Sequence, residues 1–113
     1  MSNDRKDYKL YLIDIKISCI RILRYTKNKS ENQFVNNQAL IDAVARNIEI
    51  IGEAAKHIPH EIRLKYVQVP WKEIIGARSK MIHEYFGVDT DILWKTIKED
   101  IPFLKKQIST LKK

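Results

Sequence analysis

Apolar residues recur every three to four positions along almost the whole chain, and glycine and proline hardly interrupt this pattern. Only three Gly and three Pro occur among 113 residues, and no segment has the alternation and tight turn of a strand pair. A period of three to four residues places apolar side chains on one face of an α-helix. The sequence therefore predicts an all-α fold, a bundle of four to five helices.

Two long helices are predicted in the N-terminal half. The first spans about residues 4–25, and the second follows an amide cap at Asn36-Asn37 and ends near His57. Between them, Ser30 and Gln33 have the spacing of a capping box, which predicts a short helical turn. The first helix carries a wide apolar arc, so it should contact more than one neighbour. Its two rows are Tyr8, Leu12, Ile15, Cys19 and Ile22, and beside them Leu10, Ile13, Ile17 and Ile20.

The C-terminal half predicts shorter elements. A short helix should follow Pro59 and reach Lys65, and residues 67–70 should form an extended link. Pro70 suits the first turn of the next helix, which Gly87 would end. The last helical stretch should start at Asp89 or Thr90, and Pro102 should kink or split it.

Length and composition predict one domain over residues 1–113. The chain can bury a single core, and its 44% apolar content argues against disorder. No apolar run approaches the ~20 residues of a membrane span, and the charged start is unlike a signal peptide. We therefore expect a cytoplasmic protein.

The charge balance favours a polyanionic partner. Twenty-one Lys and Arg face fourteen Asp and Glu, for a formal net charge of +7. Cationic proteins bind RNA or DNA through release of counterions. A merely soluble basic protein is the alternative, and the lysines near the C-terminus have the same two interpretations. These are Lys105, Lys106, Lys112 and Lys113.

The sequence predicts no metal or cofactor site. His57 and His60 flank Pro59, but no Asp or Glu stands at a metal-like spacing beside them. Cys19 is the single cysteine and lies on an apolar helix face, which predicts a core thiol. No glycine-rich phosphate loop and no Ser-His-Asp set is visible.

The segment from Arg78 to Tyr85, called the reactive segment below, holds a set of side chains that can cleave a phosphodiester. Arg78 is a permanent cation that can hold a phosphate, and His83 can move a proton near neutral pH. The two lie five residues apart, about 140° around a straight helix, so one helix does not aim both at one point. Either the long side chains converge or a second copy of the chain completes the site. A surface Arg and His with no joint role is the alternative.

The segment from Arg46 to Lys56 predicts a supporting element. Gly52 in mid-helix is disfavoured by roughly 1 kcal/mol relative to Ala, so we expect a close helix crossing there. Asn47 and Glu53 lie near the apolar edge and could orient the Arg and His of the reactive segment as supporting residues. The alternative is a solvated face on which acidic side chains pair with Lys56.

Four segments then form a recognisable series: Arg46–Ala54, Val69–Trp71, Arg78–Tyr85 and Asp100–Pro102. The third has the order Arg, four residues, His, any residue, Tyr. From about residue 40 to residue 108 the chain resembles the HepT-like toxins of the HEPN superfamily, whose motif allows four to six residues between Arg and His.

The resemblance implies an all-helical HEPN-type homodimer whose motif helices meet at the subunit interface. It implies a metal-independent endoribonuclease that acts as a prokaryotic toxin on RNA. Arg78 would hold the scissile phosphate, and His83 would move the proton of the ribose 2′-hydroxyl or of the leaving oxygen. General acid–base help of this kind contributes about 10²–10⁴-fold to the rate.

The resemblance also implies an antitoxin, a MntA-like nucleotidyltransferase that transfers AMP from ATP to the motif tyrosine, here Tyr85. The added nucleotide would block the groove beside His83 and Arg78 and repel RNA. A packing role next to Phe86 is the alternative for this tyrosine. Ser79 stands where the family commonly has Asn, and its shorter side chain lacks an NH₂ donor, so catalysis could be weaker.

A second interpretation of the whole chain remains open. A HEPN helical module without catalysis could bind a nucleotidyltransferase and help present its substrate. The intact pair of Arg78 and His83 favours the enzyme. A plain nucleic-acid-binding bundle is a third, weaker interpretation.

Overall fold

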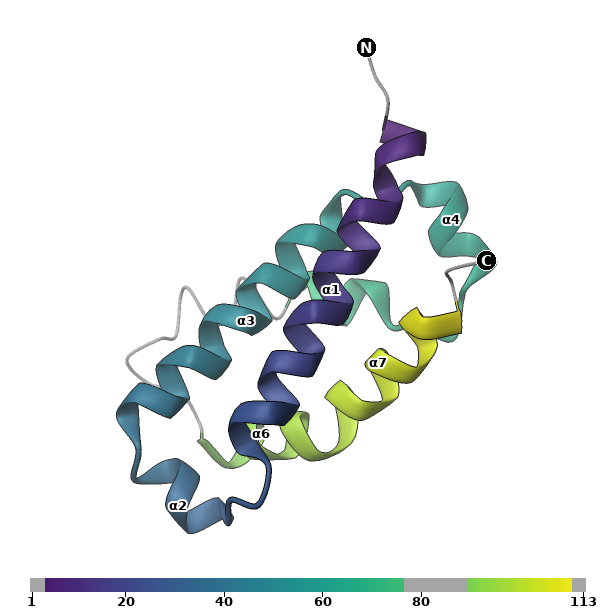
Figure 1. Cartoon of the computed structure of the whole chain (residues 1–113). Coiled ribbons are helices and arrows are strands. Elements are labelled where there is room, and N and C mark those ends of the chain that lie inside the picture. The colour runs from purple at the N-terminus through teal and green to yellow at the C-terminus, as the bar shows by residue number, and fades with distance from the viewer. Residues whose placement is uncertain (1–3, 77–89, 111–113) are drawn as a thin grey trace.

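The computed structural model of the chain describes residues 4–76 and 90–110, with side chains from Tyr8 onwards. Within these residues the regular structure is helical and no strand occurs, so the all-α prediction is confirmed. The long helices α1 (Asp4–Thr26) and α3 (Gln38–Lys56) run antiparallel and side by side, as Figure 1 shows. The C-terminal helix α7 (Ile101–Thr110) packs against α1.

Helix α1 uses one of its two apolar rows for the core. Leu12, Ile15, Cys19 and Ile22 are buried, and they contact both α3 and α7, which confirms the prediction of more than one neighbour. The second row stays at the surface, where Leu10, Ile13 and Ile17 are 61%, 49% and 40% exposed. The wide arc thus exceeds what the described helices cover.

The predicted caps before α3 are present. The hydroxyl of Ser30 accepts a hydrogen bond from the Gln33 N–H at 3.1 Å, and the Gln33 side chain accepts from the Ser30 N–H at 2.8 Å. This capping box starts the short helix α2 (Glu31–Val35). Asn37 caps α3 by accepting from the Leu40 N–H at 3.0 Å. Both caps act within four residues, which is why the sequence alone was sufficient to predict them.

The predicted extended link is wrong. After the short helix α4 (His60–Lys65), residues 66–70 form successive turns. The Val69 N–H donates to the Tyr66 carbonyl at 3.1 Å, and the Trp71 N–H donates to the Val69 carbonyl at 2.8 Å. Burial of the Val69 and Trp71 side chains accounts for the tight path, because an extended chain would carry both past the core.

The C-terminal helical stretch is interrupted where proline predicts it. Helix α6 (Thr90–Lys95) continues into a π-helical segment, η2 (Thr96–Asp100), and then into α7. Pro102 is the second residue of α7, it has no N–H to donate, and its ring would clash with the carbonyl four residues earlier in a regular α-helix. The wider π turn relieves this conflict, so the predicted interruption is confirmed.

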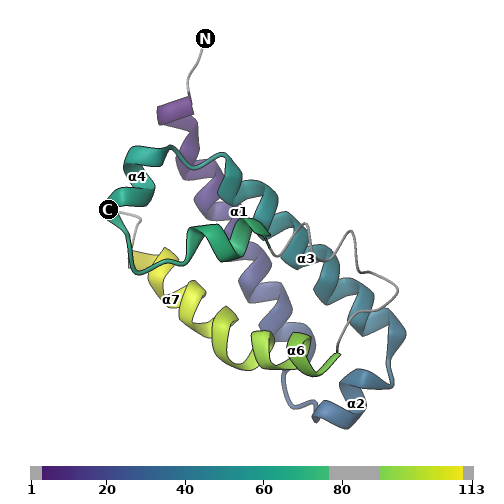
Figure 2. The same cartoon turned by 180° about the vertical axis from the view of Figure 1, so that it is seen from behind.

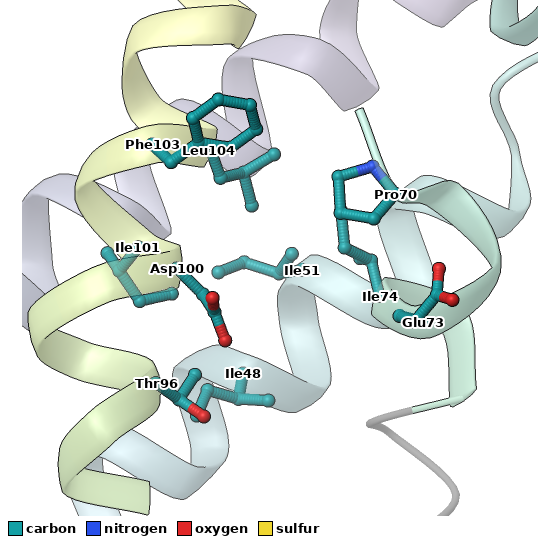
Figure 3. Close-up of a pocket in the computed structure, with 10 residues that line it drawn as sticks. All are labelled: Ile48, Ile51, Pro70, Glu73, Ile74, Thr96, Asp100, Ile101, Phe103 and Leu104. Carbon is teal, nitrogen blue, oxygen red and sulfur yellow. The ribbon is translucent and has the colours of Figure 1, made fainter. Parts of the chain in front are cut away.

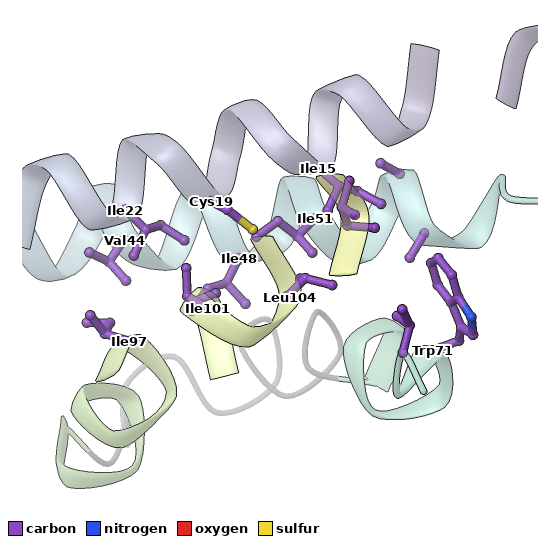
Figure 4. Close-up of a cluster of buried hydrophobic side chains, with 14 of the residues drawn as sticks. Ile15, Cys19, Ile22, Val44, Ile48, Ile51, Trp71, Ile97, Ile101 and Leu104 are labelled. Carbon is purple, nitrogen blue, oxygen red and sulfur yellow. The ribbon is translucent and has the colours of Figure 1, made fainter. Parts of the chain in front are cut away.

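The core is a layer of aliphatic side chains between α1, α3 and the C-terminal helices, as Figure 4 shows. Cys19 lies within it, and burial raises the pKa of its thiol to about 12, partly offset by Lys105. The prediction of a core thiol is confirmed. Among the described residues, no helix is long and apolar enough to cross a membrane. The labelled core residues are Ile15, Cys19, Ile22, Val44, Ile48, Ile51, Trp71, Ile97, Ile101 and Leu104.

Candidate functional site

The reactive segment itself lies outside the described residues. This holds for Arg78, Ser79, His83 and Tyr85, and also for the predicted helix end at Gly87. The structure does place the two elements predicted to carry and support that segment. These are the helical residues 71–76, directly before it in the chain, and the middle of α3.

The helix that leads to the reactive segment is anchored by Trp71. The indole is buried, with 7% of the residue exposed, and its Nε1–H donates to the Tyr66 carbonyl at 3.2 Å. The Ile74 N–H donates to the Pro70 carbonyl at 3.0 Å, so Pro70 caps the helix of residues 71–76, one position before the first turn in which it was predicted. Figure 2 shows residues 71–76 on the face of the molecule between α3 and α7. The chain therefore enters the reactive segment from a fixed position on the core.

Asn47 has an unusual environment for an amide. It is 5% exposed on α3, and its Nδ2 donates to the Ala43 carbonyl at 2.9 Å. Its Oδ1 is buried and has no hydrogen-bond partner among the residues that the structure describes. A buried unsatisfied acceptor destabilises a fold by about 1–3 kcal/mol. The position of Asn47 suits an acceptor for a donor brought by another segment.

Glu53 lies in a different environment, at the solvent-facing side of α3. Its side chain is 48% exposed, with Oε1 3.9 Å from Lys56 Nζ and Oε2 3.4 Å from His57 Nε2. The first contact is the pairing with Lys56 that the solvated-face interpretation predicted. Asn47 and Glu53 therefore differ, since one is buried and the other is on the surface. A supporting role for Glu53 toward the reactive segment stays a prediction.

The end of α3 is held by contacts that the sequence analysis missed. The His57 ring stacks on the Tyr11 ring of α1, with centroids 4.6 Å apart and planes 14° apart. Arg63 closes the helix end by donating from Nε to the Ile58 carbonyl at 3.0 Å and from Nη2 to the Lys56 carbonyl at 3.1 Å. Tyr11 and His57 are far apart in sequence, and Arg63 bonds to backbone carbonyls. The spacing of apolar residues therefore could not predict either contact.

Metal-ligating residues do not gather in the described part of the chain. No three His, Cys, Asp or Glu side chains lie close enough together there to hold an ion. His57 and His60 are both exposed. The described residues also include a carboxyl pair, in which a hydrogen bond with Asp91, desolvation and the negative charge of Asp91 raise the pKa of Glu31. It lies where α2 meets α6.

Comparison with known proteins gives one consistent family. The model of the family described as ribonuclease HepT-like matches residues 15–111. No solved structure matches the chain.

Three relatives illustrate the similarity. A Methanocaldococcus jannaschii protein named "Putative RNase MJ1380" is 44% identical over 104 residues, which cover 92% of this chain and 95% of the relative. "Putative RNase TTE0752" of Caldanaerobacter subterraneus is 46% identical over 101 residues, covering 89% and 90%. "Probable ribonuclease HepT" of Thermococcus cleftensis is 41% identical over 109 residues, covering 96% and 99%.

Proposed function

The chain belongs to the HepT-like ribonuclease family, and from this premise we propose that it is a metal-independent endoribonuclease, the toxin of a prokaryotic toxin–antitoxin pair. The family match over residues 15–111 carries the proposal, because that span contains the whole motif from Arg78 to Tyr85. The relatives named as ribonucleases, at 41–46% identity, support the same reaction class. RNA in the cytoplasm is the substrate.

The proposed reaction uses the ribose 2′-hydroxyl as nucleophile. His83 takes the proton of this hydroxyl, or delivers one to the leaving oxygen, while the 2′-oxygen bonds to phosphorus and the bond to the 5′-oxygen breaks. Arg78 stabilises the charge that develops on the phosphate oxygens. The net charge of +7 favours RNA association in the same direction. The chemistry requires RNA, because DNA lacks the nucleophile.

Asn47 is the proposed positioning residue for this pair. Its buried Oδ1 would accept the N–H of one ring nitrogen of His83 and so leave the other ring nitrogen to take a proton. Glu53 would contribute a negative charge at the same helix, and Ser79 would contact the phosphate more weakly than the usual amide. A homodimer would complete the site, since His83 follows Arg78 by five positions, about 140° around one helix.

The proposed regulation is the transfer of AMP to Tyr85. The phenolic oxygen attacks the α-phosphorus of ATP, pyrophosphate leaves, and the phenolic proton is released. A MntA-like nucleotidyltransferase would be the antitoxin that catalyses this step. An anionic nucleotide beside Arg78 and His83 would occupy the phosphate position and repel RNA.

RNA cleavage by purified protein tests the enzyme. Wild type in the presence of a chelator should cut RNA, whereas the same sequence as DNA should stay intact. His83→Ala and Arg78→Ala should each lose most of the activity, by at least about 10²-fold. Expression of wild type, and not of His83→Ala, should arrest growth.

The alternative is the module without catalysis, and Ser79 in place of the usual amide is the observation that favours it. In that case wild type and His83→Ala would be equally harmless, and both would bind the nucleotidyltransferase. A plain nucleic-acid-binding bundle would instead bind RNA and leave it intact.

Mass spectrometry tests the modification. After incubation with the partner enzyme and ATP, wild type should gain the mass of one or more AMP units, and Tyr85→Phe should gain none. An unchanged mass for wild type, or an undiminished gain for the Phe variant, would refute Tyr85 as the acceptor.

A further inference from the structure

A pocket of about 310 Å³ opens between α3, residues 70–74 and the C-terminal helices, as Figure 3 shows. This is the lower end of the size range of small-ligand pockets, roughly 300–1,000 Å³. Most of its lining is aliphatic or aromatic, and three side chains are polar. The apolar residues are Ile48, Ile51, Pro70, Ile74, Ile101, Phe103 and Leu104, and the polar ones are Glu73, Thr96 and Asp100.

The two acidic side chains that line the pocket have no cationic partner among the described residues. Within the described residues, neither Glu73 nor Asp100 has an ion pair or a side-chain hydrogen bond. This is notable in a chain with a formal net charge of +7, where cations outnumber acids. Both residues are exposed, so water screens their charges, and the field that remains at the apolar pocket wall favours a cation over an anion.

The π-helical segment presents the polar groups to the pocket. Thr96 and Asp100 are its first and last residues, and both line the pocket with side chains from the same face. The Thr96 hydroxyl donates to the Ile92 carbonyl at 3.0 Å, so its oxygen lone pairs remain to accept from a ligand. In Figure 3 the Asp100 carboxylate extends toward the apolar side chains of Ile48 and Ile51. The oxygen atoms of Thr96 and Asp100 therefore lie beside the apolar part of the pocket.

We propose that this pocket binds a small organic cation with an apolar body. Its ammonium or guanidinium group would lie at Asp100, with Thr96 as a second acceptor, and its apolar body on Ile48 and Ile51. Glu73 adds charge at the opposite wall. The two carboxylates disfavour a phosphate of RNA as the occupant, because like charges repel. The proposal uses neither Arg78 nor His83, which lie outside the described residues.

The test uses 2-phenylethylamine, which is charged at neutral pH, and isoleucine methyl groups labelled for NMR. Titration should shift the methyl signals of the pocket residues in a saturable way and leave unchanged those core methyls that do not line the pocket. The reporters are Ile48, Ile51, Ile74 and Ile101, and the silent controls are Ile15 and Ile22. Equal shifts at Ile15 and Ile22, or shifts that never saturate, would overturn the proposal.

Charge dependence is tested with a matched pair of variants. Asp100→Asn should weaken binding about fivefold, the upper end for a charge pair on an open surface. Glu99→Gln removes a neighbouring exposed acid that does not line the pocket, so affinity should stay near that of wild type. Phe103→Ala removes one apolar wall and should weaken binding without changing the charge.

The neutral isostere 2-phenylethanol completes the design. The alcohol should bind wild type clearly more weakly than the amine does. Its affinity should be the same for wild type and for Asp100→Asn. If alcohol and amine bind wild type with the same affinity, the pocket selects its ligand by apolar contact alone and the assignment to a cation is wrong.

Discussion

At the residue scale, Asn47 has an environment that is unfavourable for a polar side chain. Its amide oxygen is buried without a partner among the described residues, while most of its neighbours on the same face of α3 are aliphatic. An aliphatic residue of similar size would remove the unsatisfied acceptor. The proposed role in positioning His83 would give a reason for an amide there.

Asn47→Leu separates stability from activity. Because the variant removes the orphan acceptor, we expect its free energy of unfolding to stay within about 1 kcal/mol of wild type or to rise. RNA cleavage should fall about tenfold, since a positioning residue acts through the histidine. Denaturant unfolding and a cleavage assay measure the two effects.

A matched control is available for this variant. Asn36→Ala removes another amide that bonds the carbonyl four residues earlier, but at an exposed position. Cleavage by that variant should be unchanged. Full activity of Asn47→Leu would restrict Asn47 to packing.

The Glu31–Asp91 pair predicts a pH effect on stability. A hydrogen bond with Asp91 and its charge raise the pKa of Glu31 in the folded state. The folded protein therefore binds more proton than the unfolded chain between the two pKa values, and wild type gains stability as pH falls through the raised value. Relative to Glu31→Gln, which does not titrate, wild type should be more stable at about pH 4 than at pH 7.

Urea unfolding at both pH values measures this difference. Glu99→Gln serves as the control, because Glu99 is exposed and lies outside the pair. A difference in the free energy of unfolding between wild type and Glu31→Gln that does not change with pH would contradict a raised pKa of Glu31 at the contact of α2 with α6.

At the element scale, the structure separates what a local pattern predicts from what it does not. The caps at Ser30 and Asn37 and the interruption at Pro102 were predictable, because each depends on groups within a few residues. The path of residues 66–70 was not, because burial of Val69 and Trp71 under other elements decides it.

Trp71 is the side chain on which the helix before the reactive segment depends. Trp71→Ala should lower the free energy of unfolding by about 3–5 kcal/mol, because a large buried ring is removed. Trp71→Phe keeps most of the apolar contact and loses the bond to the Tyr66 carbonyl, so about 1 kcal/mol is expected. Chemical denaturation measures both.

Trp94→Phe is the matched control. Trp94 is half-buried, packs its ring 5.3 Å from that of Phe34, and has no indole hydrogen bond among the described residues. It should lose less stability than Trp71→Phe. If Trp94→Phe lost more stability than Trp71→Phe, the hydrogen bond to the Tyr66 carbonyl would not account for the loss in Trp71→Phe.

At the scale of the whole molecule, the central prediction is that two subunits share one catalytic site. If each site takes Arg78 from one subunit and His83 from the other, a mixed dimer of Arg78→Ala and His83→Ala regains one intact site. Half of randomly exchanged dimers are mixed, so the mixture should recover about a quarter of wild-type activity. Each variant alone should be inactive.

Subunit exchange followed by an RNA cleavage assay measures this recovery. A mixture that stays inactive although light scattering shows dimers would place both groups of each site on one subunit. A monomer that cleaves RNA would remove the need for a second copy altogether.

The sequence by itself determined the two long helices and the caps of α2 and α3, because these follow from periodicity and from contacts within about one turn. It also contained the motif from Arg78 to Tyr85 that suggested the family. It showed Pro102 as a break without showing that a π turn would form.

Only the tertiary structure decided which distant groups became neighbours. It left the row of Leu10, Ile13 and Ile17 at the surface, stacked Tyr11 on His57, and brought Asp100 beside Ile48 and Ile51. The reason is physical: burial is a property of how whole helices pack, and a single helix pattern is compatible with several packings.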